Sequence, residues 1–195
     1  IAGTHPKWLL LGAAGAAVFL LVYIRCRGYA GDRVTAWRHP ALDPGDTGYQ
    51  ILQSLYAIGS GGFFGLGPGK SRQKYLYLPF QYNDYIFAIV CEELGLVGAL
   101  GIMALFALLI FRGYRIARQA ENRFSTALAA GLISLIAVQT ILNLCVVTNL
   151  LPSTGIALPF FSYGGTALAV NLGEMGIVLN ISRSGKKRTI QEAAN

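Results

Sequence analysis

One stretch of the sequence, residues 59–98, combines glycines, clustered basic side chains and a lone aspartate beside an apolar run. Six glycines lie within 59–69, and Lys70, Arg72 and Lys74 follow at once. Glycine lets backbone N–H groups come close to an anion, and the basic side chains add positive charge. The pattern therefore favours binding of a phosphate or pyrophosphate, although the glycines alone are more often a flexible lid or a tight turn.

Asp84 directly precedes an apolar run that begins at Tyr85, and this position has two interpretations. An aspartate there could cap a helix by accepting hydrogen bonds from the N–H groups of its first turn. It could instead be a general base that takes a proton from a hydroxyl nucleophile while neighbouring cations hold a phosphate leaving group. On position alone the cap is the commoner role, and the two roles do not exclude each other.

Three further acids lie inside apolar runs, where carboxylates are costly and are functional candidates by default. Glu92 and Glu93 are adjacent and point about 100° apart on a helix, so at most one can face the same cavity as Asp84. We expect them to bind a divalent cation or to accept interior hydrogen bonds. Glu174 shares a helix face with Asn171, and we expect it to be protonated, hydrogen-bonded to amides or paired with a part of the protein outside this sequence.

The loop 152–163 carries no charge, but it holds Pro152, Thr154 and Ser162 among further prolines and glycines. Irregular backbone at membrane depth is tolerated only where protein or a water-filled cavity covers it, so this loop is predicted to line a site. Just before it, Gln139 and Asn143 are four residues apart, a spacing that favours hydrogen bonds between helices.

The elements that must position these residues are apolar helices. The composition is 54% hydrophobic and only 13% charged, and its apolar residues form runs close to the roughly 20 residues that cross a bilayer as a helix. These runs predict an all-α, polytopic transmembrane bundle forming one membrane domain, with spans at about 8–24, 85–111, 124–151 and 164–182.

Basic residues predict the orientation of this bundle. The short connection 112–123 and the tail 183–195 are rich in arginine and lysine, which places both in the cytoplasm and the long loop 25–84 outside. Within that loop, residues 37–40 and 43–46 are turn-rich and unsuited to a helix, whereas Ile51, Leu55 and Ile58 mark a short amphipathic helix starting near 46 or 47. The basic residues of this outer loop indicate an anionic partner or membrane lipid headgroups.

The net charge of +7 is therefore not a nucleic-acid signal. The three cysteines are scattered and the two histidines lie far apart, so no disulfide framework and no metal motif is predicted. Because the sequence begins at Ile1, directly ahead of an apolar run, we expect it to be the C-terminal part of a longer protein.

Three segments together carry a resemblance to a known family. YQILQSLYAIGSGGFFGLGPGKSRQKYLYLP, the NDYIFAIVCEELGLVG that follows, and LLPSTGIALPFFSYGG with its closing GIVLNISR resemble the C-terminal half of the SEDS family (shape, elongation, division and sporulation). The resemblance covers about residues 40–183 and is strongest to the FtsW-type division and sporulation members. Such proteins have about ten spans and polymerise lipid II, a disaccharide-pentapeptide on a polyprenyl pyrophosphate, beside a class B penicillin-binding protein and other division proteins.

This resemblance implies a mechanism and a site. Asp84 matches the family's essential aspartate and would deprotonate the acceptor sugar hydroxyl, while Lys74, helped by Arg72, Lys70 or a divalent cation such as Mg²⁺ or Mn²⁺, would neutralise the pyrophosphate leaving group. Ser162 and the turn 152–154 would shape the substrate groove, with Glu92 and Glu93 beside it. No organic cofactor is implied, and the location implied is the bacterial cytoplasmic membrane with the active loop outside.

The sequence departs from the family pattern just before Asp84. The family usually reads LPE followed by a His/Gln–Thr–Asp–Phe motif, whereas Phe80 replaces the glutamate, Asn83 the threonine and Tyr85 the phenylalanine. The loss of that acid weakens any metal site in the loop. Two other functions fit the same residues: a flippase or binding protein that moves lipid II without chemistry, and a scaffold for the division machinery.

Overall fold

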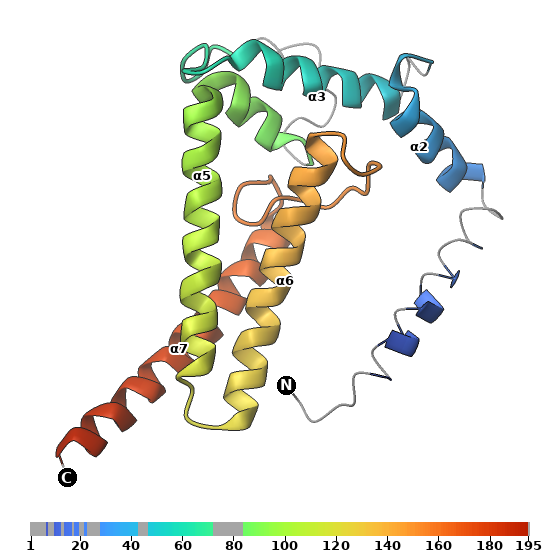
Figure 1. Cartoon of the computed structure of the whole chain (residues 1–195). Helices are drawn as coiled ribbons and strands as arrows, with labels where there is room; N and C mark the ends of the chain where they lie inside the picture. Colours follow the sequence, from blue (N-terminus) through green and yellow to red (C-terminus); the bar gives the residue numbers. More distant parts are fainter. Residues whose placement is uncertain are drawn as a thin grey trace.

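The computed structural model describes residues 28–42, 47–71 and 84–194, together with scattered positions between 7 and 22. The predicted span 8–24 is described at scattered positions, all of them helical, whereas residues 43–46, where turns were predicted, and 72–83 of the outer loop lie outside the described residues. Six helical elements run through the described part, which contains no strand: α2 (Gly28–Arg38), the 3₁₀ turn η1 (Pro40–Leu42), α3 (Thr47–Gly61), α5 (Ile86–Arg118), α6 (Arg123–Val147) and α7 (Gly165–Ala194) (Figure 1). The all-α prediction is confirmed.

Two of the described helices, α5 and α6, are long and apolar enough to cross a membrane. Only 17% of the most apolar window of α5 and 39% of that of α6 are buried within the chain. Helices so apolar and so exposed are suited to lipid or to other membrane helices, unlike the buried core helix of a soluble protein. For α7 the predicted span 164–182 stays a prediction, because polar residues interrupt its apolar run.

Helix α5 is not the single straight span that was predicted for 85–111. Gly95 has a positive φ of 67° and breaks the helix. Figure 1 shows residues 86–94 running obliquely beneath α3, and the remainder of α5 forming the long straight helix. The straight part, 96–118, is about 34 Å long at 1.5 Å per residue, enough for the hydrocarbon core. The straight apolar helix therefore begins after Glu92 and Glu93, which were predicted to lie inside the span 85–111.

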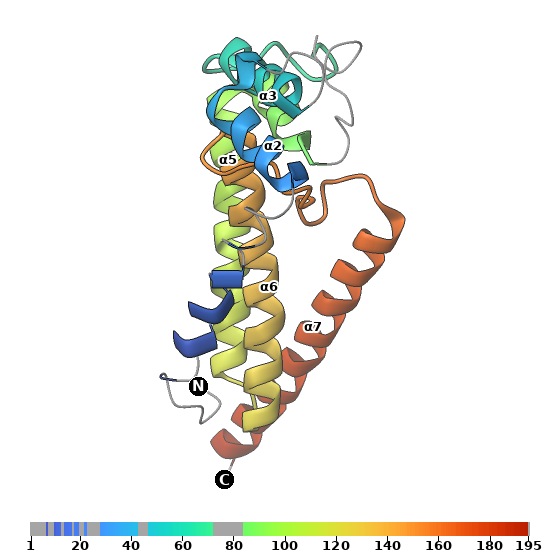
Figure 2. The same cartoon turned by 90° about the vertical axis from the view of Figure 1, so that its right-hand side faces the viewer.

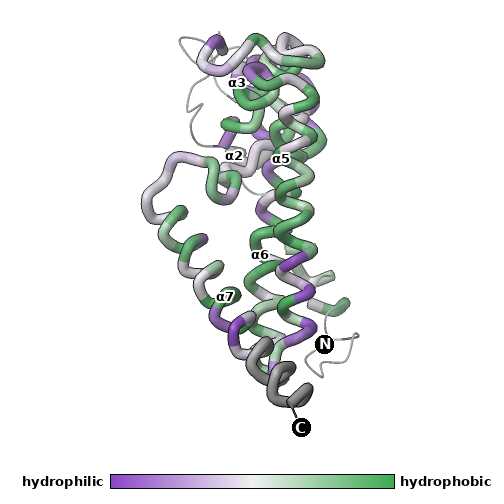
Figure 3. Tube along the Cα trace, turned by 90° about the vertical axis from the view of Figure 1, so that its left-hand side faces the viewer, coloured by the Kyte–Doolittle hydropathy of each residue, from purple (hydrophilic) through white to green (hydrophobic). Residues whose placement is uncertain are grey.

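The predicted basic connection 112–123 is also mostly helical. Helix α5 continues to Arg118, and α6 begins at Arg123 with Asn122 as its N-cap, whose side chain accepts a hydrogen bond from the Ser125 N–H (2.7 Å). The basic residues thus extend the helix ends and lie at the end of the α5–α6 pair opposite Asp84. Figure 3 shows this polar end and the apolar middle of both helices.

The outer segment contains more helix than the sequence suggested. The turn predicted over 37–40 is wrong, since α2 runs to Arg38 and η1 follows directly. The amphipathic helix is confirmed as α3, which buries Ile51, Ser54 and Ala57 on one face. Helix α3 packs on α5 and lies across its outer end (Figure 1).

The main core lies where α3, α5, α6 and the loop after α6 meet. It gathers buried side chains from all four segments, among them Ala57, Tyr85, Phe87, Val147 and Leu158. Helix α7 contacts α5 and α6, but Figure 2 shows that it stands apart from α6 at the loop end and approaches it toward the C-terminus. The fold is therefore densely packed at the Asp84 end and open between α6 and α7.

Candidate functional site

Asp84 lies at the junction of α2, α5, α6 and the loop after α6. The N-cap of α5 is Tyr85, which makes no side-chain capping hydrogen bond, so the predicted capping role of Asp84 is wrong. The physical reason is that the chain turns at Asp84 and Tyr85 before the helix starts, which leaves the Asp84 carboxylate outside the first helical turn. The carboxylate is available for another role.

Asn143 fixes the backbone of this junction. Its Nδ2 atom donates to the Asp84 carbonyl (2.7 Å) and to the Ile156 carbonyl (2.8 Å). The side chain is completely buried. One amide of α6 therefore holds the start of α5 and the following loop together, a tie to backbone carbonyls instead of the predicted side-chain contact between helices.

Helix α2 supplies the positive charge. Arg33 Nη1 donates to the Ser153 carbonyl (2.9 Å), and one turn later Trp37 Nε1 donates to the Asn149 carbonyl (3.0 Å). These two bonds dock α2 on the loop that follows α6. They also place the Arg33 guanidinium in the electrostatic field of Asp84.

The Asp84 carboxylate faces the loop at Gly155. A methyl group added to Gly155 would lie 3.5 Å from Asp84 Oδ2, so the carboxylate is in contact range of this loop. Burial raises the pKa of Asp84 above the ordinary value of 3.8, and the positive charge of Arg33 opposes that rise. Asp84 is thus a partly buried carboxylate with a more basic character than usual.

The glycine-rich loop does not present its backbone to an anion as predicted. The N–H groups of Leu66 and Gly67 donate to the Glu92 and Glu93 carbonyls (2.9 and 3.0 Å), which the kink in α5 leaves without helical partners. In return, Leu96 and Val97 donate to the Gly62 and Phe63 carbonyls (2.9 and 3.2 Å).

Glycine is required on both sides of this contact. A Cβ atom on Gly65 would overlap the Glu93 carbonyl, and one on Gly95 would lie 2.6 Å from the Phe63 carbonyl oxygen. Both residues also have positive φ angles, of 76° and 67°. The glycines therefore serve to fit the loop into the helix break, where they supply the hydrogen bonds that buried backbone needs.

The two adjacent glutamates have different environments. Glu92 is 1% exposed and accepts a hydrogen bond from Ser71 Oγ, which fulfils the expected interior hydrogen bond. Glu93 lines a separate pocket with Pro68 and Phe161. Among the residues that the structure describes, no cluster of three or more His, Cys, Asp or Glu side chains could hold a metal ion.

The remaining predicted site residues are divided between several places. Lys70 is exposed at the end of the glycine loop, and Arg72 and Lys74 lie outside the described residues. Pro152 is half-buried and Thr154 exposed, on either side of the Ser153 carbonyl that Arg33 binds. The structure therefore brings the turn 152–154 to Asp84.

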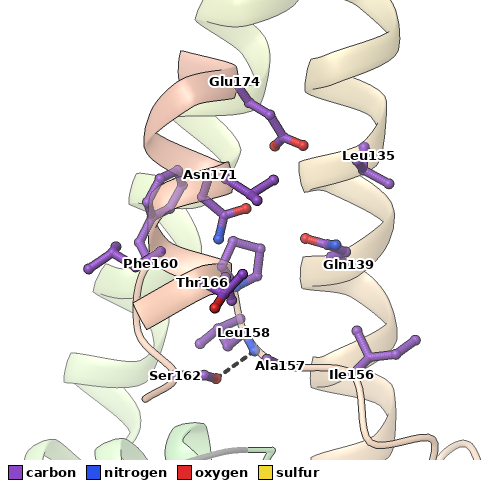
Figure 4. Close-up of a pocket in the computed structure, with 14 residues that line it drawn as sticks. Leu135, Gln139, Ile156, Ala157, Leu158, Phe160, Ser162, Thr166, Asn171 and Glu174 are labelled. Atoms are coloured by element: carbon purple, nitrogen blue, oxygen red, sulfur yellow. Dashed lines mark hydrogen bonds between the residues drawn. The ribbon is translucent and has the colours of Figure 1, made fainter. Parts of the chain in front are cut away.

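Ser162 belongs to a different feature, a cavity of about 490 Å³ between α6, α7 and the loop. Its Oγ atom accepts a hydrogen bond from the Leu158 N–H (2.7 Å) and closes a tight turn in which Phe160 has a positive φ of 64°. Figure 4 shows Gln139, Asn171 and Glu174 directed into this cavity from the two facing helices. The predicted pairing of Asn171 and Glu174 on one helix face is confirmed.

Sequence reasoning missed Arg33 as part of the site and assigned Asn143 a different role. Arg33 was one of several basic residues in the outer loop, and it is separated from Asp84 by 51 positions of sequence. Asn143 showed only the helical spacing to Gln139. One feature of the sequence could have predicted the role of Asn143. It lies about one turn before the irregular loop that follows α6, and the backbone carbonyls of that loop need hydrogen-bond donors.

Known proteins resemble this chain over most of its length. A family model for cell cycle proteins of the FtsW, RodA and SpoVE type matches residues 1–187. Stage V sporulation protein E of Bacillus subtilis is 46% identical over 184 residues, covering 94% of this chain and 50% of that protein. A probable peptidoglycan glycosyltransferase FtsW of Geobacter sulfurreducens is 44% identical over 181 residues, covering 93% and 48%.

A solved structure is also similar in fold. It was determined in work on structural coordination of polymerization and crosslinking by a peptidoglycan synthase complex, and it matches with a TM-score of 0.72 and 27% identity over 92% of this chain and 49% of that one. The chain spans about half the length of the relatives it matches. Because the family model covers almost all of its residues, the chain belongs to the FtsW, RodA and SpoVE family of cell cycle proteins.

Proposed function

We propose that this chain carries the catalytic outer face of a peptidoglycan glycosyltransferase that polymerises lipid II. The observation that carries the proposal is the Asp84 carboxylate, which has no capping role, lies at a fixed backbone junction and is within the electrostatic influence of Arg33. The relatives named as probable peptidoglycan glycosyltransferases support the reaction class.

The proposed step is a glycosyl transfer with Asp84 as general base. Its carboxylate takes the proton of the acceptor sugar's 4-hydroxyl as the oxygen attacks the anomeric carbon of the donor. The bond from that carbon to the pyrophosphate oxygen breaks, and polyprenyl pyrophosphate departs. A base with a raised pKa suits this step, since general-base catalysis improves as the pKa of the base approaches the working pH.

Arg33 and Asn143 are positioning residues in this scheme. Asn143 sets where Asp84 stands relative to Ile156, and Arg33 both orders the turn at Ser153 and opposes the rise in the pKa of Asp84. Lys70, with Arg72 and Lys74, supplies the positive charge for the pyrophosphate, as charged side chains commonly do for phosphate leaving groups.

A divalent cation has no step in this scheme. The described acids do not converge: Glu92 is occupied with Ser71, and Glu93 lines another pocket. A divalent cation bound at Asp84 would therefore take its other oxygen ligands from the substrate's phosphates and from water, as Mg²⁺ commonly does.

The setting that fits this activity is the bacterial cytoplasmic membrane, with the Asp84 end outside and the basic ends of α5, α6 and α7 inside. The matching solved structure comes from a complex that couples polymerization with crosslinking. We accordingly propose a class B penicillin-binding protein as the partner that crosslinks the strands.

The deciding experiment is polymerisation of lipid II by the purified full-length protein and its Asp84→Asn variant. We expect the variant to keep its thermal stability and to lose about 10²- to 10⁴-fold in rate, the usual contribution of a general base. Glu121→Gln, which neutralises an exposed acid in the α5–α6 turn, is the matched control and should retain the wild-type rate.

Binding of lipid II by the same variants separates the alternatives. Normal binding with no polymer by Asp84→Asn would exclude a purely transporting role. Wild-type polymerisation by Asp84→Asn would remove Asp84 as the base, and absence of polymer from the wild-type protein with its partner would overturn the proposed function.

A further inference from the structure

The cavity between α6 and α7 contains a polar group for which the reaction above has no use. Glu174 is 8% exposed and Asn171 is 7% exposed, yet both point into the cavity, as does Gln139 from the facing helix (Figure 4). Glu174 Oε2 is buried without a hydrogen-bond partner. Such an arrangement in a helix of a membrane protein marks a binding site for a complementary group.

An ionised Glu174 needs a partner that donates hydrogen bonds. The three side chains together offer a carboxylate and two amide oxygens as acceptors, and no lysine or arginine lines the cavity within the part of the chain that the structure describes. A primary ammonium group has three donors and no acceptor, so its bonding capacity matches these three acceptors. Its positive charge also compensates the carboxylate, which an amide or hydroxyl ligand would leave uncompensated.

The remainder of the cavity suits an aliphatic stem. Leu135, Ile156, Leu158 and Val170 contribute apolar surface around the three polar groups. The volume of about 490 Å³ lies in the range typical of small-molecule sites, which are mostly apolar with a few converging polar groups. Phe160, held at a positive φ of 64° by the turn at Leu158 and Ser162, forms part of the wall, and strained residues of this kind cluster at binding sites.

We propose that this cavity binds an alkylammonium group, with the ammonium between Glu174, Asn171 and Gln139 and its apolar stem against α6 and α7. The same chemistry can come from a lysine side chain of another membrane helix or from a small amphiphilic amine. This inference is independent of the proposed reaction, because Asp84 does not line the cavity.

The test uses purified protein in detergent and n-hexylamine as the probe, with n-hexanol as the neutral probe of equal chain length. Thermal midpoints are measured for the wild type, the near-isosteric Glu174→Gln variant and the Glu121→Gln control at neutral pH. If the cavity is open to an amphiphile, hexylamine raises the midpoint of the wild type and the control by about 3 °C and leaves Glu174→Gln unchanged, while hexanol has no such selectivity.

A lysine already seated in the cavity gives a different supporting result. Hexylamine then has no effect on the wild type, but Glu174→Gln lowers the midpoint because a buried lysine has lost its counter-charge. The proposal is overturned if hexylamine and hexanol act alike on wild type and Glu174→Gln. It is equally overturned if neither probe acts and Glu174→Gln is as stable as the wild type.

Discussion

Asp84 and Glu174 are the same kind of group in opposite surroundings. Asn143 donates a hydrogen bond to the Asp84 backbone carbonyl, and the Asp84 carboxylate is within the electrostatic influence of Arg33 from α2. Glu174 projects into a cavity, and one of its oxygens is buried without a partner. The first environment holds a carboxylate in place beside a positive charge, as a base requires. Asn143 Oδ1 and Asn149 Oδ1 near Asp84 are also buried without partners, but the Glu174 oxygen differs in that its side chain faces a cavity that a ligand can enter.

The difference arises from packing density. The outer end gathers α2, α3, the first part of α5, the end of α6 and the loop after it, and backbone carbonyls there find side-chain donors such as Arg33, Trp37 and Ser54. Between α6 and α7 no described segment fills the space at the loop end. This comparison can be tested by substituting the side chains that make hydrogen bonds at the Asp84 junction and, as controls, polar side chains outside it.

The largest effect is expected from Asn143→Leu. It removes both hydrogen bonds of the amide and leaves the Asp84 and Ile156 carbonyls unpaired, at a cost of about 2–5 kcal/mol in the free energy of unfolding. Lipid II polymerisation should fall at least tenfold, because Asp84 loses its position. Gln139→Leu, one turn earlier on α6, removes an amide from the cavity and not from this junction, so it should leave the polymerisation rate near the wild-type value. Equal loss in both variants would show that the junction and the cavity are not distinct.

Gly65→Ala should disrupt the contact between the glycine-rich loop and the break in α5. The added methyl group would overlap the Glu93 carbonyl at a backbone with φ of 76°, which costs about 1–3 kcal/mol in the free energy of unfolding. Thermal denaturation in detergent measures the change. Gly59→Ala, where a Cβ atom would meet nothing within 4 Å, should be neutral or slightly stabilising. A neutral Gly65→Ala would contradict the role assigned to the loop in the helix break.

Arg33→Gln should alter the pH dependence of polymerisation. Without the guanidinium, the pKa of Asp84 rises further, so the protonated and inactive form persists to higher pH. The acidic limb of the rate profile should move to higher pH, with a several-fold lower rate at mildly acidic pH and a smaller deficit at alkaline pH. Arg33→Lys should keep the limb near its wild-type position, and Arg38→Gln, exposed on the same helix, should not move it. If the acidic limb of Arg33→Gln is unchanged, Arg33 does not influence the pKa of Asp84.

The smallest effect is expected from Asn149→Gly. Asn149 has a positive φ of 58° and a buried Oδ1 atom without a partner, so glycine relieves both features while the backbone carbonyl still accepts from Trp37. A gain of about 0.5–1 kcal/mol in the free energy of unfolding should follow, visible as a higher thermal midpoint. A loss of stability would mean that the Asn149 side chain has a function in this loop.

The sequence by itself determined the class of fold, and it predicted the residue at the centre of the proposed site. Long apolar runs require helices, because backbone groups in lipid must be paired within their own segment, and this reasoning found α5 and α6 and the amphipathic α3. The position of Asp84 beside the basic loop, together with the motifs around it, indicated the family. These properties depend on the local composition and on the order of residues along the chain, both of which can be read from the sequence.

Only the tertiary structure decided what the glycines, the amide at 143 and the arginine at 33 do. Helix α5 breaks at Gly95, and the glycine-rich loop packs into the break. The hydrogen bonds of this contact join segments about thirty residues apart in sequence. The tie from Asn143 to Asp84 and the electrostatic contact with Arg33 join segments 59 and 51 positions apart in sequence. Such contacts depend on how helices pack against one another, and no local pattern encodes them. The same packing gave one acid its partners and left Glu174 facing a cavity.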